Sequence, residues 1–185
     1  PGPTTPLHEL PPDHPAVRYV RDDRGLDPVR LGRAWGVGYC EHSRHFLASR
    51  RLIAPAYDGA KLMVWQARFV GELPWKSKAD RAHELPPKWF TCPGAHKSKW
   101  LYNLDPASKF KTGVLVESPS TCWAGGPQLC GSFGKSLSAT QADLLAARLP
   151  AGTVVTSAAS GPGKQRSPTH QDVASGRGVE AASWR

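Results

Sequence analysis

The chain has 185 residues, a formal net charge of +9 and a pI of about 9.7. A surplus of lysine and arginine concentrates phosphate groups near a protein surface, so this charge predicts a polyanionic partner. No apolar run approaches the roughly 20 residues that a membrane span needs, and no signal-peptide pattern opens the chain, which argues against a membrane partner and predicts a cytoplasmic protein.

The first third of the chain predicts an arm followed by short helices. Residues 1–14 hold five prolines, which is typical of an extended Pro-rich arm. Residues 16–31 predict a pair of short helices, in which Asp27 caps the second helix and Pro28 is its first residue.

The middle of the chain predicts a β-hairpin and then irregular structure. From residue 51 two apolar runs flank Asp58-Gly59, a dipeptide typical of hairpin turns. Residues 72–87 lack apolar periodicity and predict an exposed loop. After this loop we expect a short strand, a turn at Pro93-Gly94 and a helix around residues 100–109.

The last third predicts a small α/β lobe. Residues 112–117 form an apolar run that ends in Glu117, which is typical of a buried parallel strand. Ser138 and Gln141 predict a capping box that opens a helix through residue 149, and a second parallel strand follows it. Residues 157–185 are rich in Ala, Ser, Gly and Arg, and their composition predicts a disordered tail.

Cations and aromatic residues alternate between residues 50 and 111. This pattern suits a nucleic-acid groove, because cations neutralise phosphates and aromatic rings stack on unpaired bases. It equally suits an aromatic core with a solvated lysine rim. The cations are Arg50, Arg51, Arg68, Lys76, Lys78, Lys88, Lys97, Lys99, Lys109 and Lys111, and the aromatic residues are Trp65, Trp75, Trp89, Phe90, Trp100 and Tyr102.

Four cysteines lie far apart and form no Cys-x-x-Cys pair, which argues against a zinc ribbon and a small disulfide scaffold. A zinc-stabilised nucleic-acid-binding domain stays open as an alternative. Its ligands would be spaced as Cys-x-His-x-x-His and Cys-x-x-x-His, which are not the spacings of a standard finger. These candidate zinc ligands are Cys40, His42, His45, Cys92 and His96.

Four segments in this order resemble the catalytic core of bacterial and phage DNA primases: RLIAPAYDGAKLMVWQARFVG, PKWFTCPGAHKSKWLYNLD, KTGVLVE and FGKSLSATQADLL. With HPAVRYVRDDRGLDP and WGVGYC upstream, the resemblance runs from about residue 14 to residue 155. It implies an α+β basic lobe over residues 15–105 and a partial α/β toprim-like lobe over residues 106–156.

The resemblance also implies roles for individual residues. Glu117 matches the toprim acid that serves catalysis and metal binding in the family. The residues implied to bind nucleic acid or nucleotide are Arg51, Arg68, Lys88, Lys97, Lys99 and Tyr102.

Two departures from the family pattern concern the metal site. The family continues Glu-Gly-Pro-Thr-Asp after the strand, whereas Thr121 stands here in place of the second acid. The family has an Asp-x-Asp pair after the next strand, whereas no carboxylate lies between Val155 and Asp172 in this chain. Divalent magnesium binds mainly through carboxylate and other hard oxygen ligands, so one glutamate is a poor substitute.

Two functional hypotheses follow from the resemblance. The first is a nucleotidyltransferase that makes RNA primers on a single-stranded DNA template during DNA replication, from nucleoside triphosphates and with Mg²⁺ or Mn²⁺, in company with a replicative helicase. The missing acids make the activity of this chain doubtful. The second hypothesis is a catalytically inactive nucleic-acid-binding module that keeps the cationic groove.

Overall fold

The computed structural model describes residues 1–70, 87–150 and 154–158. Its contacts divide the chain into two compact units. Unit 1 comprises Pro1–Pro55 and Trp65–Ala95, and unit 2 comprises Ala56–Val64 and His96–Arg185. The predicted loop over 72–87, apart from Pro87, and the predicted tail beyond residue 158 lie outside the described residues. The predicted lobe boundary at residues 105 and 106 stays a prediction.

A five-stranded sheet with the strands in sequence order lies mostly in unit 1, and the tip of its β3–β4 hairpin, Ala56–Val64, belongs to unit 2. Strand β2 pairs antiparallel with β1 and β3, and β4 pairs antiparallel with β5. The predicted hairpin is confirmed: β3 and β4 are adjacent, and Gly59 in their turn has φ +57°, a conformation that favours glycine. The strands are β1 (Thr5–Pro6), β2 (Gly38–Cys40), β3 (Arg51–Asp58), β4 (Lys61–Phe69) and β5 (Trp89–Thr91).

The first fourteen residues, predicted as an extended Pro-rich arm, belong to unit 1 and include strand β1. Thr5 pairs with Tyr39, and the Leu7 amide donates to the carbonyl of Val37 at 3.1 Å. The Leu7 side chain is fully buried. Burial of this apolar side chain anchors the segment to the rest of unit 1.

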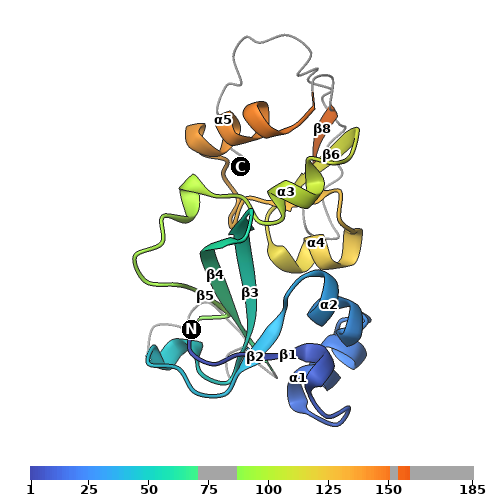
Figure 1. Cartoon of the computed structure of the whole chain (residues 1–185), viewed down its shortest axis with the longest axis vertical. Coiled ribbons are helices and arrows are strands. Elements are labelled where there is room, and N and C mark those ends of the chain that lie inside the picture. The colour runs from blue at the N-terminus through green and yellow to red at the C-terminus, as the bar shows by residue number, and fades with distance from the viewer. Residues whose placement is uncertain (71–86, 151–153, 159–185) are drawn as a thin grey trace, which may run out of the picture. The chain divides into compact units, whose positions relative to one another are not determined.

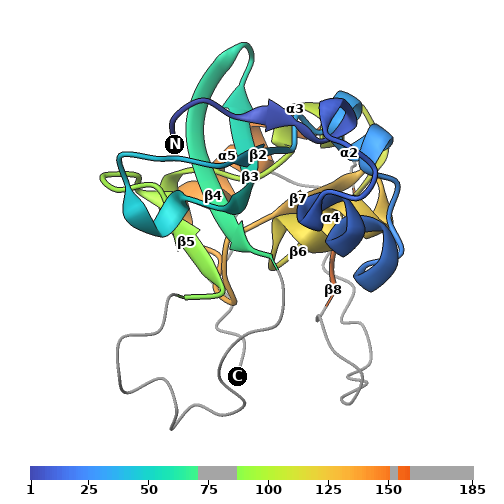
Figure 2. The ribbon, with the colours of Figure 1, turned by 90° about the horizontal axis from the view of Figure 1, so that it is seen from below.

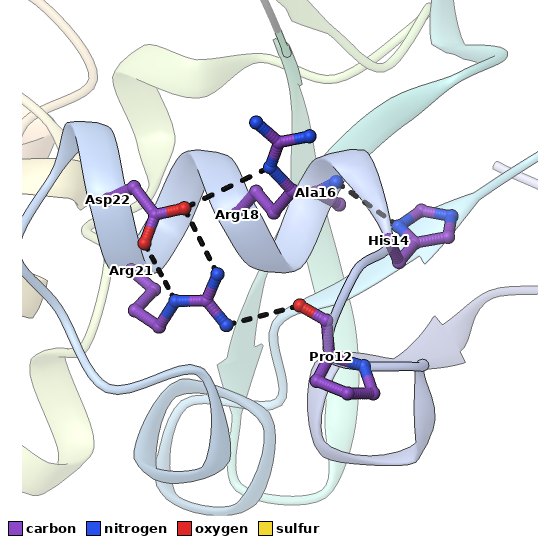
Figure 3. A network of polar contacts seen from close by, with 6 residues as sticks. All are labelled: Pro12, His14, Ala16, Arg18, Arg21 and Asp22. Atoms are coloured by element: carbon purple, nitrogen blue, oxygen red, sulfur yellow. Dashed lines mark hydrogen bonds and ion pairs between the residues drawn. The ribbon is translucent and has the colours of Figure 1, made fainter.

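The predicted pair of short helices is confirmed. His14 caps α1 (Pro15–Arg18), which continues as the π-helical turn η2 (Tyr19–Asp23). In Figure 3 the Arg21 guanidinium bridges Asp22 and the carbonyl of Pro12, which fastens η2 to the preceding segment. Asp27 accepts from the Val29 amide at 2.9 Å and caps α2 (Pro28–Ala34), whose first residue is Pro28.

Unit 2 contains a three-stranded parallel sheet in the order β7-β6-β8. Strand β6 lies between its two neighbours, and its pairing with β8 can be followed in Figure 1. The predicted parallel strands and the capping box at Ser138 and Gln141 are confirmed. The elements are η5 (Lys97–Lys99), α3 (Leu104–Ala107), β6 (Thr112–Val116), α4 (Pro119–Gly125), β7 (Leu129–Gly131), α5 (Ala139–Arg148) and β8 (Val154–Ala158).

Each unit has its own apolar core. The core of unit 1 gathers Cys40, Ala48, Ile53, Trp65 and Ala67. The core of unit 2 packs α3 and α5 against the parallel sheet, through Leu101, Leu104, Ala107, Leu115, Cys130 and Leu145. No helix in the described ranges is long and apolar enough to cross a membrane.

Candidate nucleic-acid interface

Arg68 of β4 is held between two aromatic rings in unit 1. Its guanidinium lies 5.3 Å from the ring centre of Trp89, its partner across the sheet, and 5.7 Å from that of Tyr19 on η2. The Nε and Nη2 atoms donate to the Tyr19 hydroxyl at 3.0 and 2.7 Å. Only 7% of Arg68 is exposed, and this burial lowers its pKa. An arginine stays protonated even so, and a fixed positive charge results.

Arg51, the first residue of β3, is buried in the same unit. Its Nη1 atom donates to the carbonyl of Pro87 at 2.6 Å, and its guanidinium lies 5.4 Å from the ring centre of Phe69. Burial lowers the pKa of Arg51, and the charge of Arg68 lowers it further. Within the described ranges neither arginine forms an ion pair with a carboxylate, so their charges are offset only by carbonyls, a hydroxyl and ring faces.

The predicted lysines divide between the two units. Lys88 is exposed beside Trp89, and its carbonyl accepts from the Phe69 amide at 3.0 Å, so it lies at the end of the sheet that carries Arg51 and Arg68. Lys97 and Lys99 are exposed on η5 of unit 2, and Lys97 Nζ donates to the carbonyl of Phe133 at 3.4 Å. The structure thus brings together three of the predicted cations in unit 1 and two in unit 2.

Gln141 fastens the lysine-bearing turn η5 to the rest of unit 2. Its Nε2 atom lies within hydrogen-bond distance of the carbonyls of Lys97, Trp100 and Ser132, at 3.1, 2.8 and 3.0 Å. Its Oε1 accepts from the Ser138 amide at 3.0 Å, and Ser138 Oγ donates to the carbonyl of Ser98. Only 1% of Gln141 is exposed. The capping box of α5 therefore also holds the backbone under both lysines.

Tyr102 lies inside unit 2, where its ring has no face open to a base. Only 2% of it is exposed, and its hydroxyl accepts from Trp123 Nε1 at 2.8 Å. Its backbone exchanges two hydrogen bonds with Gly131, at 2.8 and 3.0 Å. Burial raises the pKa of Tyr102 strongly. The resemblance implied that Tyr102 contacts nucleic acid. Because the ring is buried, we leave Tyr102 out of the proposed interface.

Replacing Tyr102 with Phe tests this assignment. We expect the free energy of unfolding to fall by about 1–2 kcal/mol, because a buried hydrogen bond to Trp123 is lost. Affinity for single-stranded DNA should stay unchanged. Urea unfolding and a fluorescence-anisotropy titration measure the two quantities, and a large loss of affinity at unchanged stability would assign Tyr102 to the binding surface.

Glu117 directly follows β6 at the carboxyl end of the parallel sheet, where its side chain is half-buried. Ser118 then caps α4, and its hydroxyl lies 3.0 Å from the hydroxyls of Ser120 and Thr121. The residue at position 121 thus supplies a neutral hydroxyl group where the primase pattern has a carboxylate.

The described part of the chain holds no group of three or more His, Cys, Asp or Glu residues that could bind a metal ion. For Mg²⁺ or Mn²⁺, this means that Glu117 lacks, in that part of the chain, the further acids that the family pattern places near it. The finding applies equally to the candidate zinc ligands. Cys40 is buried in the core of unit 1, where burial raises the pKa of its thiol, and Cys92 Sγ accepts from the Trp65 amide at 3.4 Å.

Solved primase structures share the fold of this chain. It superposes with a TM-score of 0.58 and 17% identity on the Aquifex aeolicus primase structure that contains zinc-binding and RNA polymerase domains, over 78% of this chain and 43% of that one. The Escherichia coli primase catalytic core gives the same score and identity, over 82% of this chain and 56% of that one. The chain has the fold of a primase catalytic core.

The primase-core fold is shown by structure and not by sequence. No family model matches the chain. No curated protein matches it in sequence either. The chain spans about half the length of the primase structures that it matches. The predicted α+β lobe followed by a partial α/β lobe agrees with this fold.

Two contacts of the residues at the candidate interface were not predicted from the sequence. Tyr19 lies in the predicted helix pair over residues 16–31, and its hydroxyl accepts a hydrogen bond from Arg68, which is 49 positions away in the sequence. Gln141 was identified only as a capping residue. The capping box gave the signal for its backbone role, but no sequence signal predicted its contact with η5.

Proposed function

We propose that the chain is a single-stranded nucleic-acid-binding module built on the primase-core fold. The observation that carries the proposal is the pair of buried arginines in unit 1, with exposed Lys88 beside them. Arg51 and Arg68 hold their charges in a poorly solvated place without a carboxylate partner in the described residues, which strengthens their attraction for an anion nearby. A phosphate backbone supplies that charge.

The proposed ligand is single-stranded DNA of the template type, with nucleoside triphosphates as smaller anionic ligands of the same cations. Lys88 of unit 1 and Lys97 and Lys99 of unit 2 are exposed and suited to direct phosphate contacts. Arg51 and Arg68 would act mainly through their positive potential, since their side chains are buried. A helicase partner remains an expectation from the family resemblance.

Primer synthesis is the second candidate, and the place of Glu117 favours it. A carboxylate at the carboxyl end of a parallel strand is suited to act in phosphoryl transfer. Such chemistry needs Mg²⁺ or Mn²⁺, and the described residues do not assemble ligands for either ion. Binding without nucleotidyl transfer is therefore the better-supported proposal.

A combined assay separates the two candidates. Single-stranded DNA would be incubated with the full chain and labelled nucleoside triphosphates, with Mg²⁺ and with Mn²⁺, while complex formation is followed on native gels. The proposal expects a shifted complex and no extended product. Template-dependent product that disappears in Glu117→Gln would establish the second candidate, and the absence of any complex would overturn both.

A further inference from the structure

The loop between β2 and β3 displays an exposed aromatic ring. Phe46 opens the turn η3 (Phe46–Ala48) and is 85% exposed, more than any other large apolar residue in the described ranges. One exposed apolar side chain is ordinary on a protein surface. Three further observations distinguish this one: the rigidity of its loop, its position on the sheet and its charged neighbours.

The loop that carries Phe46 is held in one conformation by its own hydrogen bonds. The Ser43 amide donates to Ser49 Oγ at 2.9 Å, and the His45 amide donates to Ser43 Oγ at 3.1 Å. Ala48, two residues after Phe46, is fully buried in the core of unit 1. The ring is therefore presented on a fixed support, which limits the entropy lost on binding.

The strand register places this loop at the cationic end of the sheet. Cys40, the last residue of β2, pairs with Arg51, the first residue of β3, and the loop connects the two. Arg51 in turn reaches the carbonyl of Pro87, next to Lys88. Figure 2 shows the loop, drawn in cyan, beside β5 of the same unit, consistent with the packing of Ala48 and Phe90 in one core.

Two arginines flank the ring in the sequence. Arg44 and Arg50 are exposed on either side of Phe46 in the sequence, and Glu41 is the acid of this loop, with its carboxylate 3.4 Å from Arg50 Nε. An exposed phenyl ring on a loop that carries two exposed arginines suits a ligand that combines flat apolar faces with negative charge. An unpaired nucleotide has both, because its base stacks and its phosphate attracts arginine.

We propose that Phe46 is a base-stacking residue for single-stranded nucleic acid. It would hold one unpaired base while the strand's backbone follows the end of the sheet that carries Arg51, Arg68 and Lys88. This inference rests on the proposed function and adds a base contact to its phosphate contacts. Because a ring face accepts any base, the contact would be tolerant of sequence.

Fluorescence-anisotropy titration of the full chain with a labelled oligothymidine tests the stacking role. Phe46→Ala should weaken binding by about 5- to 100-fold, and Phe46→Trp should bind at least as tightly as the wild type. The slope of log affinity against log salt should not change, since no phosphate contact is removed. The melting temperature should also stay unchanged, because the ring is exposed.

Two controls make the test specific. Val29→Ala trims another exposed apolar residue of unit 1, on α2, and should leave affinity unchanged. An abasic oligonucleotide of equal length should bind wild type and Phe46→Ala equally well.

If the wild type binds oligothymidine and Phe46→Ala binds it equally, the stacking role is overturned while the proposed function stands. If the wild type does not bind, the proposed function fails. A change in sedimentation of Phe46→Ala at equal affinity would assign the ring to a protein contact instead, which also overturns the proposal.

Discussion

Replacing Gln141 with Leu is expected to lower the free energy of unfolding by about 3 kcal/mol. The substitution leaves the Ser138 amide and the carbonyls of Lys97, Trp100 and Ser132 without their buried partner, and each unsatisfied buried group costs roughly 1–3 kcal/mol. The measured loss should be smaller than the total for all four groups, because water can hydrogen-bond to them once η5 loosens. Urea unfolding followed by fluorescence measures the loss.

Gln141 should also affect DNA binding, because it holds the turn η5 that carries Lys97. When η5 loosens, Lys97 should contribute less to binding single-stranded DNA, so Gln141→Leu and Lys97→Ala should have less than additive effects on affinity. Gln141→Leu and Lys88→Ala should be additive, because Lys88 lies in unit 1. Gln128→Leu, which removes one hydrogen bond to the Gly125 carbonyl at 3.0 Å, serves as the matched control. Equal destabilisation by the two glutamine substitutions would contradict the role.

Removing three exposed lysines together is expected to have the largest effect on binding. The combined Lys88→Ala, Lys97→Ala and Lys99→Ala variant should bind single-stranded DNA roughly 10- to 100-fold more weakly at low salt. Each lost phosphate contact lowers the slope of log affinity against log salt by about 0.7, so the slope should fall by about 2. Anisotropy titrations at several salt concentrations provide both quantities.

The control for this variant removes the same amount of charge from the helices α1 and α2 of unit 1. Arg18, Arg30 and Arg33 are exposed on α1 and α2, and their triple replacement with Ala lowers the net charge by the same three units. We expect a smaller loss of affinity and a smaller change in slope. Equal effects of the two triple variants would mean that the chain binds DNA by its overall charge and has no defined interface.

Local sequence signals predicted most of the elements, since they depend on neighbouring residues. The Asp27 cap, the Asp58-Gly59 turn and the Ser138 capping box each involve groups within three positions of one another. The packing of residues 1–14 could not be predicted, because it depends on the hydrogen bond of Leu7 to Val37, a residue distant in the sequence. A segment this short shows no periodic pattern of apolar residues from which such a long-range contact could be predicted.

The site was predictable in composition but not in exposure. The alternating cations and aromatic residues include both exposed residues of the proposed interface and core residues, and the sequence offered no way to separate them. Arg51 and Arg68 proved buried and Tyr102 entered the core of unit 2, whereas the three lysines stayed exposed. Whether a ring or a guanidinium faces water depends on strand register, which is set by pairing between distant segments.

The central claim is our proposal that the chain binds single-stranded nucleic acid and that this binding does not require Mg²⁺. It is tested most directly by titrating a labelled single-stranded oligonucleotide with the full chain at low salt, once with Mg²⁺ and once with EDTA. We predict saturable binding of equal or slightly higher affinity in EDTA, because Mg²⁺ only competes for the phosphates. Absence of saturable binding, or binding that requires Mg²⁺, would contradict the claim.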